Sequence, residues 1–446
     1  MNSIAMKYAT ARAPRYTSYP TAPHFQKGFP EATYRTWLAR RDAAEPISLY
    51  LHVPFCRRMC WYCGCSMKLA RRYGPVSDYL EALLAEIDLV TGVMPGGQRV
   101  AHVHWGGGSP TVLSPDDLST AMNMLHRRFA ILSDAEIAIE IDPRTLTDEL
   151  VAVLGGEGFN RASLGVQEFD PTVQAAINRE QPFSMVAQAT AGLREAGVSA
   201  INFDLMYGLP FQTAAMLAKT VDMAVGLRPD RIALFGYAHV PWMAKNQRMI
   251  PEDALPNAAE RLEQSEVAAE RLVSHGYRRI GLDHFALPDD PMAGPAQLRR
   301  NFQGYTTDTA ETLIGLGASS ISALPLGYVQ NVTETGAYAR AVRDGVLPIA
   351  KGRALDDDDR LRRSVIERLM CDLQVDLEAE ALRFGAQPDY FEPEIERLGD
   401  LQDHGLVRIS DGSVVITEAG RPVMRAVASV FDAYLNVEGA RHSKIA

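Results

Sequence analysis

The sequence predicts an α/β protein whose main domain is a partial (β/α)6 TIM-like barrel, preceded by an N-terminal arm and followed by a small, mostly helical domain. Two observations lead to this prediction. Strand patterns alternate with helical patterns six times between residue 48 and about residue 283, and no hairpin signal separates them. This alternation is typical of parallel strands wound in one direction. Six units are fewer than the eight of a closed barrel, which predicts an open barrel with a wide cleft.

Residues 1–47 are expected to form the arm. They include the segment 14–21, Pro-Arg-Tyr-Thr-Ser-Tyr-Pro-Thr, whose prolines disfavour a regular helix. Its hydroxyl groups and its arginine suggest an arm docked on the substrate side, and this is the prediction. The alternative is an ordinary N-terminal extension packed on the core, which the chemistry of these residues, taken alone, favours.

The barrel domain and its extension are expected to cover residues 48–350. An amphipathic helix is predicted at residues 76–93. Residues 284–350 are less regular and rich in Gly, Pro and Asn, and we assign no strands to them. The six strands are predicted at residues 49–53, 100–105, 136–141, 162–169, 200–206 and 232–237.

The C-terminal domain is expected to cover residues 351–446, after an acidic run at 356–359 that marks a boundary. Two short strands, 406–409 and 414–416, flank Asp411-Gly412, which is a turn signal. Helices are predicted at 361–373, 389–404 and 420–434. The pattern is winged-helix-like, but without a basic recognition helix it predicts a packing scaffold or lid.

Composition restricts the class of function. The chain has 446 residues, 47% of them hydrophobic, enough for one large and one smaller domain. Its net charge of −10 argues against a general nucleic-acid binder. No apolar run is long enough to span a bilayer. The absence of an export signal and the clustered, reduced cysteines predict a cytoplasmic protein.

Four of the five cysteines lie within ten positions, on the loop expected after the first strand. Cys56, Cys60 and Cys63 have the spacing C-x3-C-x2-C, which allows three thiolates to converge on one iron–sulfur cluster. Because a 4Fe–4S cluster takes four thiolates, three leave one iron open for a substrate. The alternative is a structural zinc site, but its second ligand pair is missing, since Cys371 is about three hundred residues away. A disulfide is disfavoured because there is no secretory signal.

Polar groups and glycines follow the other predicted strands. Three glycines, Gly106 to Gly108, leave the second strand and let a ligand approach the main chain closely. Glu140 ends the third strand, where a carboxylate can hold ribose hydroxyls. Gln167, Arg179 and Asp204 follow at later strand ends. Four such groups around one rim predict a binding site. His239 and His284 have no partner at metal-ligand spacing, so we expect structural roles for both.

The C-x3-C-x2-C motif and its aromatic-flanked third cysteine resemble the radical S-adenosylmethionine superfamily. Over essentially the whole chain the sequence is similar to one of its families, the oxygen-independent coproporphyrinogen III oxidases. The matching segments are residues 14–21, 63–65, 105–110, 208–210 and 300–307. A related haem-binding chaperone is the alternative. It carries a histidine at the position of Arg300 and typically lacks the arm and Cys65.

The resemblance implies a role for each matched residue. Cys56, Cys60 and Cys63 would ligate a 4Fe–4S cluster, and Cys65 would not be a ligand. Four residues match contacts to a cluster-bound S-adenosylmethionine: Tyr50, Gly107, Glu140 and Ile321. Seven match a second S-adenosylmethionine site: Tyr62, Gly108, Ser109, Gln167, Arg179, Asp204 and Ala238. Tyr62 and Ser109 replace the phenylalanine and threonine that are common there.

The reaction implied by the resemblance is a radical oxidative decarboxylation. A 5′-deoxyadenosyl radical takes a hydrogen atom from the β-carbon of a propionate side chain of coproporphyrinogen III, and the reaction is repeated on a second propionate. Loss of CO2 and an electron leaves vinyl groups and gives protoporphyrinogen IX. A flavodoxin- or ferredoxin-type reductant, an unidentified electron acceptor and a monomeric state are expected. Propionates need cationic partners, and Arg15, Arg299 and Arg300 are the hypothesised ones.

Overall fold

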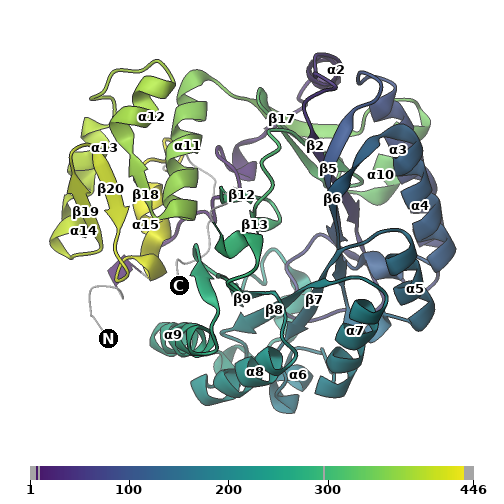
Figure 1. Ribbon diagram of the computed structural model, residues 1–446, viewed down its shortest axis with the longest axis horizontal. Coiled ribbons are helices and arrows are strands. Elements are labelled where there is room, and N and C mark those ends of the chain that lie inside the picture. The colour runs from purple at the N-terminus through teal and green to yellow at the C-terminus, as the bar shows by residue number, and fades with distance from the viewer. Residues whose placement is uncertain (1–6, 9–10, 295–296, 436–446) are drawn as a thin grey trace.

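The computed structural model describes residues 7–8, 11–294 and 297–435; the predicted arm and C-terminal domain each include residues outside these ranges. A barrel with its helices on the outside fills one side of the molecule, and residues after 355 form a separate layer on the other side (Figure 1). The described part of the arm, from residue 11 onward, runs between the two (Figure 1). In the described ranges no helix combines the length and apolarity needed to cross a membrane.

All six predicted barrel strands are present, parallel, and neighbours in chain order. This confirms the α/β barrel prediction. The strands are β2 (Ile47–Val53), β5 (Arg99–Gly107), β6 (Ala130–Ile141), β7 (Arg161–Gln167), β8 (Ala200–Tyr207) and β9 (Arg231–Gly236). The covering helices are α3 (Gly74–Thr91), α4 (Pro115–Arg128), α5 (Asp148–Gly156), α6 (Pro171–Ala176), α7 (Phe183–Glu195), α8 (Ala214–Gly226) and α9 (Ala258–Ser274).

The two faces of the barrel strands differ in polarity. On β2, Leu49, Leu51 and Val53 are fully buried in the apolar core that includes residues of α3. Successive side chains of a strand point to opposite faces. The residues between these leucines, such as Tyr50, therefore face the barrel interior. Polar residues also lie at the neighbouring positions of the next strands, for example His104 beside Tyr50. The barrel interior is therefore lined with polar side chains rather than filled with aliphatic ones.

Residues 284–350 are more regular than expected. In the described part of the chain they add strands at both edges of the sheet, which has thirteen strands in all when the short strands at residues 26–27 and 278–280 are included. On one edge, β14 pairs in parallel with β2 and continues into antiparallel strands. The added strands are short and rich in glycine, which is why no period-2 pattern marked them. They are β14 (Leu313–Leu316), β15 (Ile321–Leu324), β16 (Gly327–Asn331) and β17 (Ile349–Ala354), with β1 (Gln26–Lys27) beyond β17.

The other edge carries β11 (His284–Ala286), antiparallel to β9, and then β10 (Arg278–Ile280). A separate hairpin is formed by β12 (Arg299–Asn301) and β13 (Gly304–Thr306). The helices α2 (Glu31–Ala39) and α10 (Thr335–Arg343) complete this part of the chain. His284 is buried and bonds Asp283, so it has the structural environment that was expected of it.

The layer after residue 355 has its own apolar core. Its three-stranded sheet contains the predicted turn, since Asp411 and Gly412 both have positive φ. The helix predicted at 389–404 is interrupted at Leu398, and the last helix ends at Ser429. The elements are α11 (Asp357–Asp372), β18 (Gln374–Asp376), α12 (Leu377–Arg383), α13 (Glu392–Arg397), α14 (Gly399–Asp403), β19 (Val407–Ser410), β20 (Ser413–Ile416) and α15 (Met424–Ser429).

The arm is fastened to this layer. Ala13, Tyr16 and Tyr19 are buried in its apolar core. The Tyr16 hydroxyl donates to Asp432 Oδ2 at 3.0 Å, and Arg425 Nε donates to the Pro14 carbonyl at 3.0 Å. The arm is therefore a docked part of the fold, and it lines the space between the layer and the barrel.

Candidate functional site

The cysteine loop leaves β2 at the carboxyl end of the barrel. A two-residue parallel ladder between β3 (Phe55–Cys56) and β4 (Lys68–Leu69) closes it at its base. All five cysteines of the chain are free thiols. Cys60 is buried, whereas Cys56 and Cys63 are partly exposed. The loop thus presents thiols at the sheet edge where α/β folds place their chemistry.

Two amide side chains from a 3-10 helix, residues Lys245–Met249, fix the path of this loop. Asn246 Nδ2 donates to the carbonyls of Cys60 at 3.2 Å and Cys63 at 2.8 Å. Gln247 Nε2 donates to the Tyr62 carbonyl at 2.8 Å and to the Ala238 carbonyl at 3.2 Å. Sequence reasoning missed both residues, because they are more than 180 residues from the cysteines and belong to no motif.

Two guanidinium groups reach the sulfur of Cys60. Arg144 Nη2 lies 3.2 Å from this sulfur and Arg179 Nη1 lies 3.3 Å from it. Asp142 holds both arginines: Arg144 Nη2 is 2.7 Å from Asp142 Oδ2, and Arg179 Nη1 is 3.5 Å from it. Arg179 also donates to the Gly165 carbonyl at 2.5 Å. Arg144 stands two residues after Asp142, a strand-end pairing that could have been read from the sequence.

The environments of the thiols differ. A hydrogen bond from the Cys65 thiol lowers the pKa of Cys63 to about 7, although burial opposes this. Burial, together with the charges of Cys63 and Cys60, raises the pKa of Cys56 to about 12. The Cys56 thiol is thus within electrostatic reach of Cys60 and Cys63. Nearby cations, or coordination to a metal, would allow all three thiols to be deprotonated at the same time.

These residues fit an iron–sulfur cluster better than a single ion. Within the described ranges, no three Cys, His, Asp or Glu groups converge on a point that one metal ion could occupy. A cluster instead takes one thiolate per iron, so its ligands are spread apart. The two guanidinium groups on Cys60 suit a sulfur that carries negative charge. The three thiols and their arginines are therefore chemically suited to hold a 4Fe–4S cluster.

The glycine run at the end of β5 is required by packing. A Cβ on Gly108 would lie 2.6 Å from the Phe55 carbonyl oxygen, and one on Gly107 would lie 2.7 Å from the His52 ring. The N–H groups of Gly108 and Ser109 donate to the carbonyls of Val53 and Phe55 at 2.9 and 2.8 Å. The glycines thus let β5 approach the base of the cysteine loop, and these N–H groups are already used within the protein.

Three of the four residues matched to the first S-adenosylmethionine site lie on adjacent strands. The Gly107 N–H donates to Glu140 Oε2 at 3.2 Å, and the Tyr50 ring stacks on His104 at 5.8 Å. His104 in turn bonds Glu140 Oε1 at 3.2 Å. These bonds lower the pKa of Glu140 even though burial opposes it. The fourth residue, Ile321, is on β15, two strands from β2.

The residues matched to the second site are spread around the same rim. Arg179 contacts Cys60, and the carbonyls of Tyr62 and Ala238 share the donor Gln247. Gln167 is buried with a left-handed φ of 66°. The others have partners of their own: Gly108 packs on Phe55, the Ser109 hydroxyl bonds Thr111 at 2.8 Å, and Asp204 accepts from Ser163 at 3.4 Å.

Asp204 and Glu140 face one another electrostatically. Burial and the charge of Glu140 raise the pKa of Asp204 to about 7. The hydrogen bonds of Glu140 push its own pKa in the other direction. One carboxylate at this rim is therefore firmly ionised and the other titrates near neutrality, an asymmetry typical of functional sites.

The three arginines hypothesised to bind propionates are not on one surface. Arg299 bonds Glu367 at 2.9 Å and Glu311 at 3.4 Å. Arg300 is stacked on the Tyr305 ring at 4.3 Å and donates to the Arg15 carbonyl. Both line a small pocket behind the arm, whereas Arg15 lines a much larger cavity.

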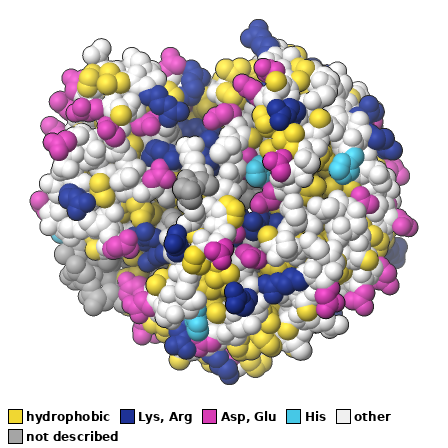
Figure 2. Space-filling view, viewed as in Figure 1, with side chains coloured by type: hydrophobic (Ala, Val, Ile, Leu, Met, Phe, Trp, Pro, Cys, Tyr) yellow, Lys and Arg dark blue, Asp and Glu magenta, His cyan; other side chains and the backbone are white. Residues whose placement is uncertain are grey.

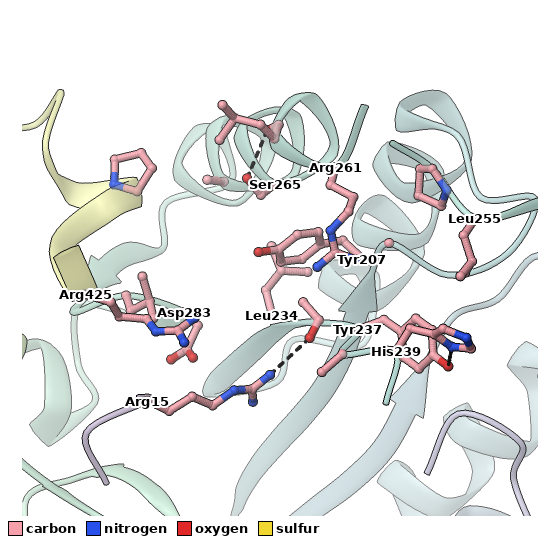
Figure 3. Close-up of a pocket in the computed structure, with 18 of the residues that line it drawn as sticks. Arg15, Tyr207, Leu234, Tyr237, His239, Leu255, Arg261, Ser265, Asp283 and Arg425 are labelled. Carbon is pink, nitrogen blue, oxygen red and sulfur yellow. Dashed lines mark hydrogen bonds between the residues drawn. The ribbon is translucent and has the colours of Figure 1, made fainter. Parts of the chain in front are cut away.

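That larger cavity, of about 430 Å³, opens at the carboxyl ends of β8 and β9. Arginines from the arm, from α9 and from α15 point toward it (Figure 3). Lys and Arg side chains also gather on the surface where the C-terminal layer meets the barrel (Figure 2). This basic character contrasts with the acidic net charge of the chain.

Comparisons with known proteins agree with this geometry. The family model of the Radical SAM superfamily matches residues 50–224, and that of the HemN C-terminal domain matches residues 355–423. A protein of Bradyrhizobium diazoefficiens named oxygen-independent coproporphyrinogen III oxidase is 48% identical, over 99% of each chain. One of Cereibacter sphaeroides, named anaerobic coproporphyrinogen III oxidase 1, is 44% identical over 97% of this chain and 96% of its own.

A solved structure shows the same fold. The coproporphyrinogen III oxidase HemN of Escherichia coli, described as a radical SAM enzyme, superposes with a TM-score of 0.92. It is 37% identical, and the match covers 97% of this chain and 99% of the other.

Proposed function

The chain belongs to the family of oxygen-independent coproporphyrinogen III oxidases, and on that premise we propose how its own residues serve the reaction. It is a radical S-adenosylmethionine enzyme of haem biosynthesis that converts two propionates of coproporphyrinogen III to vinyl groups, giving protoporphyrinogen IX. When bound, the 4Fe–4S cluster and S-adenosylmethionine supply the radical that removes a hydrogen atom from an unactivated carbon. The observation that supports this function best is the full-length identity of 48% to a protein of that name.

The cysteine loop is the cluster site of the proposal. Cys56, Cys60 and Cys63 are the ligands, and Cys65 donates a hydrogen bond to Cys63 rather than ligating. Arg144 and Arg179 hold positive charge against Cys60, which stabilises the ligated, anionic form. Asn246 fixes the loop backbone from outside. The protein thus positions the cofactor and tunes its charge, while the cofactor provides the chemistry.

The binding of S-adenosylmethionine is assigned to the neighbouring strand ends. Tyr50, Gly107, Glu140 and Ile321 would hold the cluster-bound molecule. The ionised Glu140 suits ribose hydroxyls or an ammonium group, since its pKa is held low. The proposal places a second molecule against Tyr62, Gly108, Ser109, Gln167, Arg179, Asp204 and Ala238.

The finer parts of the proposal are a second S-adenosylmethionine, a flavodoxin- or ferredoxin-type reductant, a separate electron acceptor, a monomeric enzyme and a cytoplasmic location. Five free thiols are consistent with the location. Arg299 and Arg300 are retained as parts of the pocket behind the arm, and a direct contact with substrate is proposed for Arg15.

The test is turnover by anaerobically reconstituted protein. We expect 5′-deoxyadenosine and CO2 to form in matched amounts, and only when coproporphyrinogen III is added. A Cys60→Ser variant, which loses one cluster ligand, is expected to produce neither. Slow formation of 5′-deoxyadenosine without CO2 would contradict the assignment of coproporphyrinogen III as the substrate. Failure to reconstitute any cluster would contradict the assignment of a 4Fe–4S cofactor.

A further inference from the structure

The cavity beside β8 and β9 has an unusual balance of charge. Among the described residues that line it, Asp283 is the one carboxylate. Much of the wall is apolar or aromatic, including Leu234, Tyr237 and Trp242, and its neutral polar groups include Ser265. Its arginines come from four segments of the chain and are Arg12, Arg15, Arg261, Arg279 and Arg425.

Asp283 balances these charges only in part: Arg15 is one of the groups that lower its pKa, after His284 and Arg300. It accepts a hydrogen bond from His284 Nδ1 at 2.8 Å and lies 3.9 Å from Arg300 Nη1. Although burial acts against it, these neighbours lower the pKa of Asp283 to about 2. Its charge is therefore already engaged behind the wall. Arg425 is engaged as well, because it holds the carbonyls of Ala13 and Pro14 in the arm.

Arg261, on α9, is the most informative of the remaining arginines. Its guanidinium lies over the Tyr207 ring at 5.5 Å and points into the cavity (Figure 3). Arg261 forms no salt bridge to a described acidic residue, in contrast to Arg271 on the same helix. Two glycines make room for it: a Cβ on Gly208 would lie 2.1 Å from Nη1, and one on Gly236 would lie 3.2 Å from Nη2. The fold therefore reserves space for a cation that it does not neutralise.

Arg15 and Arg279 also line the cavity, and neither forms a salt bridge to a described acidic residue. Arg15 approaches from the arm and donates to the Gly236 carbonyl at 3.3 Å (Figure 3). Arg279 Nε is buried without a hydrogen-bond partner. Burial, and then the charge of Arg15, lowers the pKa of Arg261; burial, and then Arg421, lowers the pKa of Arg279. Several like charges that are partly buried together destabilise the protein, and binding of an anion relieves their repulsion.

The cavity adjoins the cysteine loop. Gln247 donates to the carbonyl of Ala238 in the cavity wall and to the carbonyl of Tyr62 in the loop. One side chain thus separates the two. A substrate with several carboxylates at its edge can place one toward the loop and others in the cavity.

We propose that this cavity anchors the substrate through the propionates that the product retains, with Arg261 as the principal contact and Arg15 and Arg279 beside it. The propionate that reacts must lie at the cysteine loop and loses its carboxylate, so a lasting anchor has to be elsewhere. Guanidinium groups bind carboxylates in a bidentate manner. The aromatic and apolar wall suits the pyrrole rings, and the volume is that of a small-molecule site. The inference rests on the proposed function, which supplies the tetrapyrrole.

The experiment measures equilibrium binding of coproporphyrin III, the oxidised and unreactive form of the substrate, to cluster-loaded protein without S-adenosylmethionine. Arg261→Met is expected to weaken binding by about tenfold or more, the loss of one charged contact. Gly208→Ala keeps every charge but occupies the space of the guanidinium, so it is expected to weaken binding as well. Arg271→Met is the matched control: this residue is on the same helix but pairs with Asp222 on the outer surface.

The outcomes separate the anchor from the proposed function. Arginine-dependent binding supports the anchor, and it would do so even if wild-type protein released no CO2, a result that refutes the proposed function alone. Binding by Arg261→Met and Gly208→Ala equal to that of the control overturns the anchor, whatever the turnover. Weaker binding of S-adenosylmethionine with unchanged binding of coproporphyrin III also overturns it, because the cavity would then serve the cofactor.

Discussion

Two groups of arginines stand at the same end of the barrel in opposite electrostatic states. Beside the cysteine loop, Arg144 and Arg179 share Asp142 and the sulfur of Cys60. In the cavity, Arg261 and Arg279 form no salt bridge to a described acid. Burial disfavours all four cations. Their neighbours raise the pKa of the first pair and leave the pKa of the second pair lowered.

The difference separates two uses of one residue type. An arginine that is paired with an anionic group of the protein is part of the scaffold and holds a fixed geometry. A buried arginine without such a partner destabilises the folded state, and binding of an anionic ligand offsets that destabilisation. The first group is therefore suited to tuning a resident cofactor, and the second to capturing a substrate that comes and goes.

The largest expected effect comes from breaking the paired group. Arg179→Met leaves Asp142 with one partner and removes donors from Cys60 and Gly165. We expect the free energy of unfolding to fall by about 3 kcal/mol, the typical cost of removing one member of a buried pair. Iron and sulfide content after reconstitution should fall to less than half that of wild type. Urea unfolding and metal analysis measure the two effects. Wild-type values in both would show that the pairing is incidental.

An effect of similar size is expected at a buried acid that has hydrogen bonds but no cationic partner. Glu86, on α3, accepts from the Gly317 N–H, Asn331 Nδ2 and the Tyr338 hydroxyl, each at 2.6 Å. Burial raises its pKa from 4.5 to about 7, and these bonds only partly oppose it. The folded state therefore keeps a proton that the unfolded state releases. The stability due to Glu86 is fully present below about pH 4.5 and is lost as the pH rises to about 7.

The measurement is the unfolding free energy of wild type and Glu86→Gln across this range. The difference between the two curves should change by about 3 kcal/mol, from 1.4 kcal/mol per pKa unit, and level off above pH 7. A difference that stays constant with pH would mean that hydrogen bonds alone keep Glu86 ionised.

The smallest effect on stability is expected in the unpaired group. Arg261→Met removes a cation without leaving a buried acid unpaired, so the free energy of unfolding should stay within about 1 kcal/mol of wild type or rise. Arg271→Met, which removes an exposed pair with Asp222, should leave the free energy of unfolding essentially unchanged. Both are measured by urea unfolding. A loss at Arg261 as large as that at Arg179 would make the two groups alike and remove the comparison.

The barrel could be predicted from sequence because its signals are local. Each of the six strands has a period-2 or continuous apolar run, and Leu49 to Val53 show why: their helix-facing side chains are fully buried. Residues 313–354 could not be predicted. Their strands are short and include Gly315 and Gly327, whose role is to let neighbouring backbones approach. Such positions have meaning only once the partner strand is in place.

The candidate site divides in the same way. The spacing of Cys56, Cys60 and Cys63 is a local signal and located the loop. The residues that hold it are not local, since Asn246 and Gln247 reach it across more than 180 positions. Arg261 could not have been singled out either. Its importance depends on Gly208 and Gly236, which are on other elements and look like ordinary turn residues in the sequence.

The docking of the arm sets an order on how the protein is made. Residues 13–16 are synthesised long before their partners Arg425 and Asp432, from which they are separated by more than 400 positions. Chains emerge from the N-terminus onward, so the barrel can form before these partners exist. The arm can dock only after Arg425 and Asp432 have been added to the chain. Because Arg15 lines the cavity, a nascent barrel lacks its complete carboxylate anchor until the C-terminal layer that holds the arm has been made.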